Sequence, residues 1–378
     1  MNKIKKRLWT TIWTAATATV AWGQSNAGIH VREGDEYLKN HRYPEAAAAY
    51  ERALGVQPTL TDALYGAATA YRRLCRYETA LKYASKLTNL APEDARGYAE
   101  IGAVKTRLKK FQEAEEALHQ AVKLDPSAEN LTLRAELYYA WERRDRAEVD
   151  VKKALEIKED YAPAVALNAI IMAENEMMED ALRELSRYIA NHPQSYEAYA
   201  ARAWVNYLAQ QDMNPAILDA EQAIKINPFF IPAYRHKAFA LSLSGENLDA
   251  EKTYTEALAF DPQNPDLYFE RGCERMALDM RGEALDDFDK ALKLRPDFAM
   301  VYVQRGILRT QMEDYPAAVR DLSRALELEP SNAWAYLCRG HAYIGARDVK
   351  NACDDYKNAE KYGHPNGTMF FEQYCGKK

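Results

Sequence analysis

The residues DFDKALKLRPDF at positions 287–298 are followed, 34 positions later, by DLSRALELEPSN at positions 321–332. The two segments keep the same order of small, large and turn-forming residues. Ala291 corresponds to Ala325, and Pro296 corresponds to Pro330. A match at a fixed interval of this size predicts an internal structural repeat. We therefore expect further copies of the segment along the chain.

Prolines close helix-like runs at the same interval through most of the chain. They stand at Pro58, Pro92, Pro126, Pro193, Pro228, Pro262, Pro296 and Pro330. The longer gap between Pro126 and Pro193 has room for one more copy, in which Glu159 stands where the proline should be. A tenth copy ends at His364. The sequence thus predicts ten repeats over residues 27–364, starting near residues 27, 61, 95, 128, 162, 197, 231, 265, 299 and 333.

Two columns of small residues run through the copies. Twelve residues before each closing position stand Ala46, Ala80, Ala114, Ala147, Ala181, Ala216, Ala250, Ala284, Ala318 and Ala352. Twenty-four residues before it stand Gly34, Ala68, Gly102, Ala135, Ala169, Trp204, Ala238, Gly272, Gly306 and Gly340. Because small side chains let two helices approach closely, these columns predict the crossing point of a helix pair in each copy. Trp204 is the single exception.

The spacing of residues within a copy is helical. Tyr268, Arg271, Gly272 and Arg275 fall at i, i+3, i+4 and i+7, which places them on one face of a helix. Prolines also stand at the expected first turn of second helices, where proline is tolerated, at Pro44, Pro215 and Pro316. Each copy is therefore expected to be a helix, a turn and a second helix.

The chain resembles the tetratricopeptide repeat family, whose 34-residue unit has an aromatic residue, small residues and a closing proline at set positions. Here these are Tyr302, Gly306, Ala318, Leu322, Ala325 and Pro330. The resemblance implies an all-α fold, a right-handed superhelical solenoid of about ten helix-turn-helix repeats. The fourth and fifth copies, residues 128–196, match least well. A one-residue deletion before the fourth and an extra residue before the sixth predict a local irregularity.

The amino-terminal segment has the layout of a secretory signal peptide. Four basic residues are followed by residues 8–23, which carry no charge. We expect residues 1–23 to be a signal peptide that is cleaved and the protein to be exported, periplasmic or secreted, in a bacterium. A retained anchor is the alternative, although the run is shorter than a bilayer span of about 20 residues. The formal net charge of −6 gives no basic excess, which argues against nucleic acid as a partner.

Five cysteines are present, an odd number that leaves at least one unpaired if the protein is exported. The tail of residues 365–378 is expected to fold back as a short capping helix over the last repeat. A disulfide between Cys353 and Cys375 is a reasonable consequence, and the ACDDY segment and terminal YC resemble the endings of exported bacterial repeat proteins. The alternative is that all five cysteines are small apolar fillers.

No catalytic or ligand-holding pattern stands out. The seven histidines have no metal-ligand spacing, and CxxC, GxSxG, GxGxxG and phosphate-loop motifs do not occur. We therefore expect no enzyme activity, no cofactor and no metal site.

The family resemblance implies that the first helix of each copy lines an inner, concave face. In the first three copies the inner positions are polar and basic, and they lack the lysine and asparagine pairs of the family's clamp for a peptide carboxyl terminus. In the last four copies they are mostly apolar. The predicted partner-binding groove consists of Arg235, Phe239, Phe269, Cys273, Met276, Val303, Ile307, Trp334, Leu337, His341 and Ile344. Some of these side chains could instead support packing between repeats.

These observations favour a non-enzymatic scaffold that binds a protein or peptide in its groove in the bacterial envelope. Two alternatives stay open. The chain could be an accessory or regulatory subunit of an envelope enzyme or secretion complex, or a helical repeat protein that binds glycans. The sequence does not predict the oligomeric state.

Overall fold

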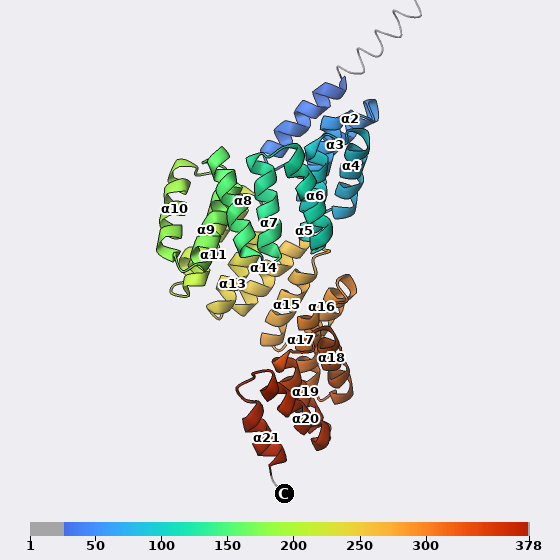
Figure 1. Ribbon diagram of the computed structural model, residues 1–378, viewed down its shortest axis with the longest axis vertical. Coiled ribbons are helices and arrows are strands. Elements are labelled where there is room, and N and C mark those ends of the chain that lie inside the picture. The colour runs from blue at the N-terminus through green and yellow to red at the C-terminus, as the bar shows by residue number, and fades with distance from the viewer. Residues whose placement is uncertain (1–25, 377–378) are drawn as a thin grey trace, which may run out of the picture. The chain divides into compact units, whose positions relative to one another are not determined.

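The structure is a computed structural model that describes residues 26–376. The predicted signal peptide of residues 1–23 lies outside the described residues. Over residues 26–376 the chain is helical and has no strand, and a helical stretch over residues 26–39 precedes the first numbered helix. The predicted all-α solenoid of about ten helix-turn-helix repeats is confirmed (Figure 1).

The helices alternate between a first and a second helix of each repeat. The first helices after residues 26–39 are α3 (Thr61–Arg73), α5 (Ala95–Arg107), α7 (Ala128–Ala140), α9 (Ala162–Glu174), α11 (Tyr196–Ala209), α13 (Ile231–Leu243), α15 (Pro265–Ala277), α17 (Ala299–Gln311) and α19 (Ala333–Gly345). The second helices are α2 (Tyr43–Val56), α4 (Tyr77–Leu90), α6 (Phe111–Leu124), α8 (Arg144–Ile157), α10 (Met178–Asn191), α12 (Asn214–Ile226), α14 (Asn247–Phe260), α16 (Arg281–Leu294), α18 (Tyr315–Leu328) and α20 (Val349–Lys361). A final helix, α21 (Gly367–Cys375), follows.

Among the described residues, the chain forms two compact units, residues 26–236 and residues 237–376. The first unit contains the first six repeats, and the second contains α14 to α21. The border falls within α13. Within each unit, successive helices pack side by side, as repeat physics requires, because one helix pair cannot bury its own apolar face (Figure 1).

The glycine column marks the helix crossing, as predicted. A Cβ atom added to Gly306 would lie 2.6 Å from Cγ of Leu322, and one added to Gly340 would lie 2.6 Å from Cε1 of Tyr356. Both distances are shorter than any normal carbon contact. The first helix therefore needs a glycine here because a large side chain of the second helix fills the space.

The aromatic column and the closing prolines are linked by a hydrogen bond. In each case a tyrosine hydroxyl near the start of the first helix donates to the carbonyl oxygen of the closing proline before it. The pairs are Tyr234 with Pro228 at 3.0 Å, Tyr268 with Pro262 at 3.3 Å, Tyr302 with Pro296 at 3.2 Å and Tyr336 with Pro330 at 3.3 Å. The bond ties the first helix to the turn between repeats, which gives a physical reason for the recurrence of the tyrosine. The proline recurs for a different reason, because it ends the preceding helix.

The sixth repeat corrects two expectations. Helix α11 begins at Tyr196, in step with the preceding repeats, and has 14 residues where the other numbered first helices have 13. The extra residue therefore lies within this repeat and not before it. The insertion lies between the crossing position and the closing proline, Pro228. Counting 24 residues back from Pro228 therefore reaches Trp204, one residue too late. The small residue at the crossing is Ala203, which is fully buried, so the column has no exception.

The last repeat is covered by α21, as expected of the tail. Phe370, Phe371 and Cys375 pack against the buried side chains of Leu337 and Tyr356. Cys353 and Cys375 are joined in a disulfide, with their Cα atoms 5.9 Å apart. The disulfide ties α21 to α20, the second helix of the last repeat.

Among residues 26–376, no helix is both long enough and apolar enough to span a bilayer.

Candidate functional site

The predicted groove residues of the eighth repeat are half-buried and take part in packing. Phe269, Cys273 and Met276, all on α15, contact the core cluster that contains Phe288. The Phe269 ring lies 5.1 Å from that of Phe298. Burial raises the pKa of Cys273 to about 12, so its thiol stays protonated and is a poor nucleophile.

Two predicted groove residues are core residues. Val303 is fully buried and Leu337 is 2% exposed. Both point into clusters between neighbouring helices, so neither offers surface to a partner in this structure. Ile307, one turn after Val303 on α17, is half-buried against the same cluster. The position of a residue within the repeat does not distinguish groove residues from core residues. The same face of the first helix contains residues of both kinds.

The predicted groove residues near the end of α19 pack against α21, the capping helix of the same chain. The ring of His341 makes an edge contact with that of Phe370 at 4.6 Å, and Ile344 packs against the cluster beneath α21. Burial lowers the pKa of His341, which favours the neutral ring. The capping helix therefore takes up this part of the predicted groove.

Trp334 is the largely exposed member of the predicted set. It is 44% exposed, and its ring stacks on His364 with centroids 5.5 Å apart. Met300, which the sequence prediction missed, is 41% exposed and occupies the same position one repeat earlier. The 34-residue interval between Met300 and Trp334 could have revealed this second apolar side chain. At the same position in the eighth repeat, Asp266 pairs with Arg295 at 2.7 Å.

Arg235 and Phe239 lie on α13 and are both half-buried. Arg235 belongs to the first unit and Phe239 to the second. The Phe239 ring makes an edge contact with Tyr254 at 6.3 Å.

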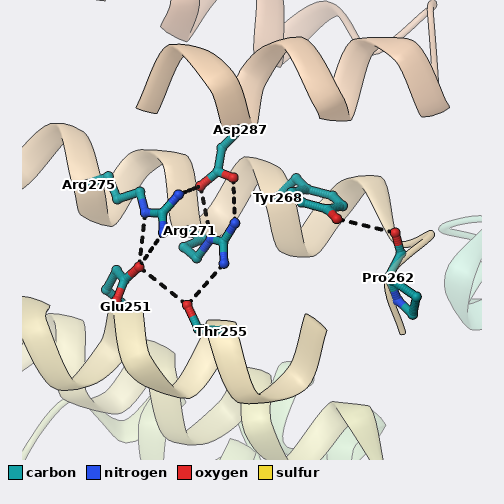
Figure 2. A network of polar contacts seen from close by, with 7 residues as sticks. All are labelled: Glu251, Thr255, Pro262, Tyr268, Arg271, Arg275 and Asp287. Atoms are coloured by element: carbon teal, nitrogen blue, oxygen red, sulfur yellow. Dashed lines mark hydrogen bonds and ion pairs between the residues drawn. The ribbon is translucent and has the colours of Figure 1, made fainter. Parts of the chain in front are cut away.

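A repeating arginine–aspartate network supports the helices of this region (Figure 2). The guanidinium of Arg271, on α15, donates two hydrogen bonds to the carboxylate of Asp287 on α16, at 2.9 and 2.7 Å. A third donor of Arg271 reaches Thr255 Oγ1 on α14 at 3.0 Å. One side chain thus joins its own repeat to the preceding one, in the paired geometry that makes arginine–carboxylate contacts strong.

The same network recurs along the chain. Arginine pairs with a buried aspartate of the second helix in Arg134–Asp150, Arg202–Asp219, Arg305–Asp321 and Arg339–Asp355. The third contact to the preceding repeat recurs in Arg202–Ser186, Arg305–Asp289 and Arg339–Ser323. Arginine and aspartate stand at fixed offsets in several copies, a signal in the sequence that could have predicted this network. In three of these repeats, the arginine links the first helix to the second helix of its own repeat and to the second helix of the preceding one.

Two of the basic side chains predicted on the inner face of the first three repeats, Arg72 and Arg96, are paired. Arg72 donates to both carboxylate oxygens of Glu100 at 2.6 and 3.0 Å, with side-chain exposures of 12% and 3%. Arg96 pairs with Asp94 and Asp62 at 2.7 and 2.9 Å. The Arg96 hydrogen bond lowers the pKa of Asp94. These arginines are therefore satisfied within the protein and do not form a free basic surface.

Comparison with known proteins agrees with the architecture. Residues 31–95 and 95–127 each match the family described as tetratricopeptide repeat, and residues 306–345 match the one described as TPR repeat. The chain is 31% identical over 99 residues to the Hsp70-Hsp90 organizing protein of Triticum aestivum, covering 26% of this chain and 17% of that protein. It is 24% identical over 277 residues to the DnaJ homolog subfamily C member 7 homolog of Schizosaccharomyces pombe, covering 68% and 54%.

The match to the first of these relatives thus covers less than a fifth of that relative's length. Among solved structures, that of yeast Tom70 is similar, with a TM-score of 0.48 and 15% identity over 92% of this chain and 95% of that one.

Proposed function

We propose that this chain, which belongs to the tetratricopeptide repeat proteins, is a non-enzymatic scaffold that binds a protein partner through the first-helix face of its ninth and tenth repeats. The observation that carries the proposal is the exposure of Met300 and Trp334 at equivalent positions of adjacent repeats. Large exposed apolar side chains in register offer a partner two anchors at a set spacing.

Rigid support makes these anchors suitable for binding. Trp334 begins α19, whose Arg339 is held by Asp355 and Ser323, and the neighbouring helix α17 is held by Arg305 in the same way. A partner that binds there loses little of its binding energy to ordering the scaffold, because the helix spacing is already fixed.

The partner is proposed to bind through apolar contacts and not through a terminal carboxylate. Two relatives named above are linked by name to chaperones, and the family's carboxylate clamp uses lysine and asparagine pairs. At the inner positions of the first repeat this chain has Val31, Arg32 and Asp35. In the next two repeats, Arg72 is paired with Glu100, and Arg96 with Asp94 and Asp62. These two guanidinium groups are therefore already engaged and less available to a carboxylate.

Site-specific photo-crosslinking tests the proposal. A photoreactive phenylalanine analogue at Trp334 should capture a defined protein from the source cells, identified by mass spectrometry. The same analogue at Leu248, which is 54% exposed on α14, is the control position. Equal capture of the same protein from Leu248 would contradict a surface centred on Trp334.

The purified partner then allows a quantitative test. Met300→Ser combined with Trp334→Ala should weaken binding by roughly thirtyfold, since truncating an anchor often costs about 2 kcal/mol. Leu248→Ser, at a 54% exposed position on α14, is the matched control and should leave the affinity unchanged. A double variant that keeps its helical signal and binds as tightly as the wild type would place the binding surface elsewhere.

Export to the bacterial envelope is part of the proposal. The basic start and the uncharged run of residues 8–23 support it. The disulfide between Cys353 and Cys375 is of a kind that persists in oxidising compartments. The intact mass of the protein isolated from an envelope fraction should correspond to cleavage near residues 21–24. Recovery of the full-length chain in the cytosol would overturn this part.

A further inference from the structure

The first repeat of the first unit touches its sixth repeat. Asn227 Nδ2, at the end of α12, donates to the Tyr43 hydroxyl at 3.2 Å, although 184 residues separate the two. The Tyr43 ring meets Phe229 at 5.3 Å, and the His41 ring meets Tyr196 at 5.0 Å, both edge-on. His41 Nδ1 also lies 3.2 Å from the Tyr43 hydroxyl, so the two residues act together.

The contact buries the side chain of Tyr43, which a plain solenoid would leave more open. Tyr43 is 3% exposed. Tyr77 and Tyr315, which occupy the same position in the second and ninth repeats, are half-buried. In a repeat array each unit contacts its nearest neighbours, so packing between adjacent repeats does not account for the burial of Tyr43.

Titratable groups of distant repeats also influence one another in the first unit. Arg73, at the end of α3, lies in the field of Tyr196, Tyr43 and Glu197, which raise its pKa. The side chain of Glu129, on α7, is exposed, but the surrounding protein and Glu100 raise its pKa. These directions agree with the direct contacts between the first and sixth repeats.

We propose that His41 and Tyr43 form a latch that holds the first unit closed on its sixth repeat, and that its release opens the inner face of repeats two to five. The latch consists of side chains at helix ends, and each repeat it joins is completed by its own helix pair. It can therefore open while both repeats stay folded, which is the property of a conformational switch. The inference does not depend on the surface proposed around Trp334.

The latch is tested by a distance measurement in the full chain. Spin labels are placed at Asn40 and Lys225, two exposed positions on either side of the contact, after Cys75, Cys273 and Cys338 are replaced by serine. The chain with an intact latch should give one narrow distance distribution. Tyr43→Ala should shift it to longer and broader distances. Tyr77→Ala, at the same position one repeat later, is the matched control and should keep the narrow distribution.

A second measurement reports on the inner face itself. With cysteine at the exposed position of Glu129 on α7, a bulky polymer-linked maleimide should react several-fold faster in the Tyr43→Ala chain than in the chain with an intact latch or in the Tyr77→Ala control. If Tyr43→Ala loses its helical signal, Asn227→Ala takes its place in both experiments. It keeps the Tyr43 ring and removes the donor to the Tyr43 hydroxyl, together with the oxygen that accepts from the Phe229 N–H. Equal distances and equal labelling rates in latch variant and wild type would overturn the proposal, as would a broad distribution in the wild type.

Discussion

At the residue scale, the turn between the two helices of each repeat needs one residue with left-handed backbone geometry. Positive φ angles between 51° and 81° recur at His41, Cys75, Lys109, Glu142, Glu176, Gln210, Gly245, Asp279, Glu313 and Arg347. Only Gly245 is the residue type that adopts this geometry without strain. The turns were therefore not visible as glycines in the sequence. The sequence shows each turn only through the fixed spacing of the two helices that flank it. The packing of these two helices holds the turn residue in its left-handed geometry.

His236 is a residue whose environment predicts a pH effect. Its ring stacks on Trp204 at 5.0 Å, and its Nδ1–H donates to the carbonyl oxygen of Ala200 at 2.9 Å. Burial lowers the pKa of His236 to about 4, and Arg235 acts in the same direction. In the unfolded chain the pKa of this histidine is near 6.5. Between about pH 6.5 and pH 4, the unfolded chain therefore binds a proton at residue 236 that the folded chain does not bind.

The stability of the first unit should therefore fall as the pH drops from about 6.5 to about 4, by up to about 3 kcal/mol, and then level off for this group. His236→Gln keeps a donor for Ala200 without a titrating ring, and it should flatten this part of the pH profile in chemical denaturation. His119→Gln, at an exposed position, is the control. An unchanged slope in the His236→Gln protein would contradict the assignment.

At the scale of the helices, two glycines should respond to alanine in opposite ways. A Cβ on Gly306 would meet Leu322 at the helix crossing, whereas a Cβ on Gly282, near the start of α16, would meet nothing within 4 Å. Gly306→Ala should destabilise the protein by about 1–3 kcal/mol through overpacking. Gly282→Ala should stabilise it by about 0.5–1 kcal/mol through helix propensity. Denaturation curves of the two variants measure both effects.

A second prediction at this scale concerns the capping helix. With nine residues, α21 is too short to be stable alone, and the Cys353–Cys375 disulfide closes a loop with a sequence separation of 22. Reduction or Cys375→Ser should lower its stability by about 2–4 kcal/mol. Amide hydrogen exchange in α21 should accelerate, whereas Cys273→Ser should leave α21 protected. Unchanged protection after reduction would mean that packing by Phe370 and Phe371 suffices.

At the scale of the whole molecule, a destabilising substitution in one repeat should lower the stability of that repeat and its neighbours only. The stability of stacked repeats is a sum of repeat and nearest-neighbour contributions. Gly306→Ala should therefore accelerate hydrogen exchange in α17, α18 and the adjacent helices, and it should leave α3 to α8 as protected as in the wild type (Figure 1). Uniform acceleration along the chain would show that the molecule unfolds as a single cooperative block.

The sequence by itself determined the repeat, its length, the number of copies and the nature of the helix crossing. Each of these depends on contacts within one copy or between adjacent copies, so the same residue types recur at 34-residue intervals. Ala291, Ala325 and most of their equivalents, such as Ala121 and Ala257, are buried because the same pair of helices packs in the same way in each copy. The capping role of the tail was predictable for the same reason, since an end repeat needs a cover.

Tertiary structure alone decided which residues of an inner helix face remain open to a partner. Val303 and Trp334 both occupy predicted groove positions, but one is buried by its neighbours and the other is exposed. It also decided the contact between Tyr43 and Asn227, which lie far apart in the sequence and in different repeats. Such a contact leaves no interval in the sequence, because it depends on the accumulated curvature of the intervening helices, to which each repeat contributes a small rotation.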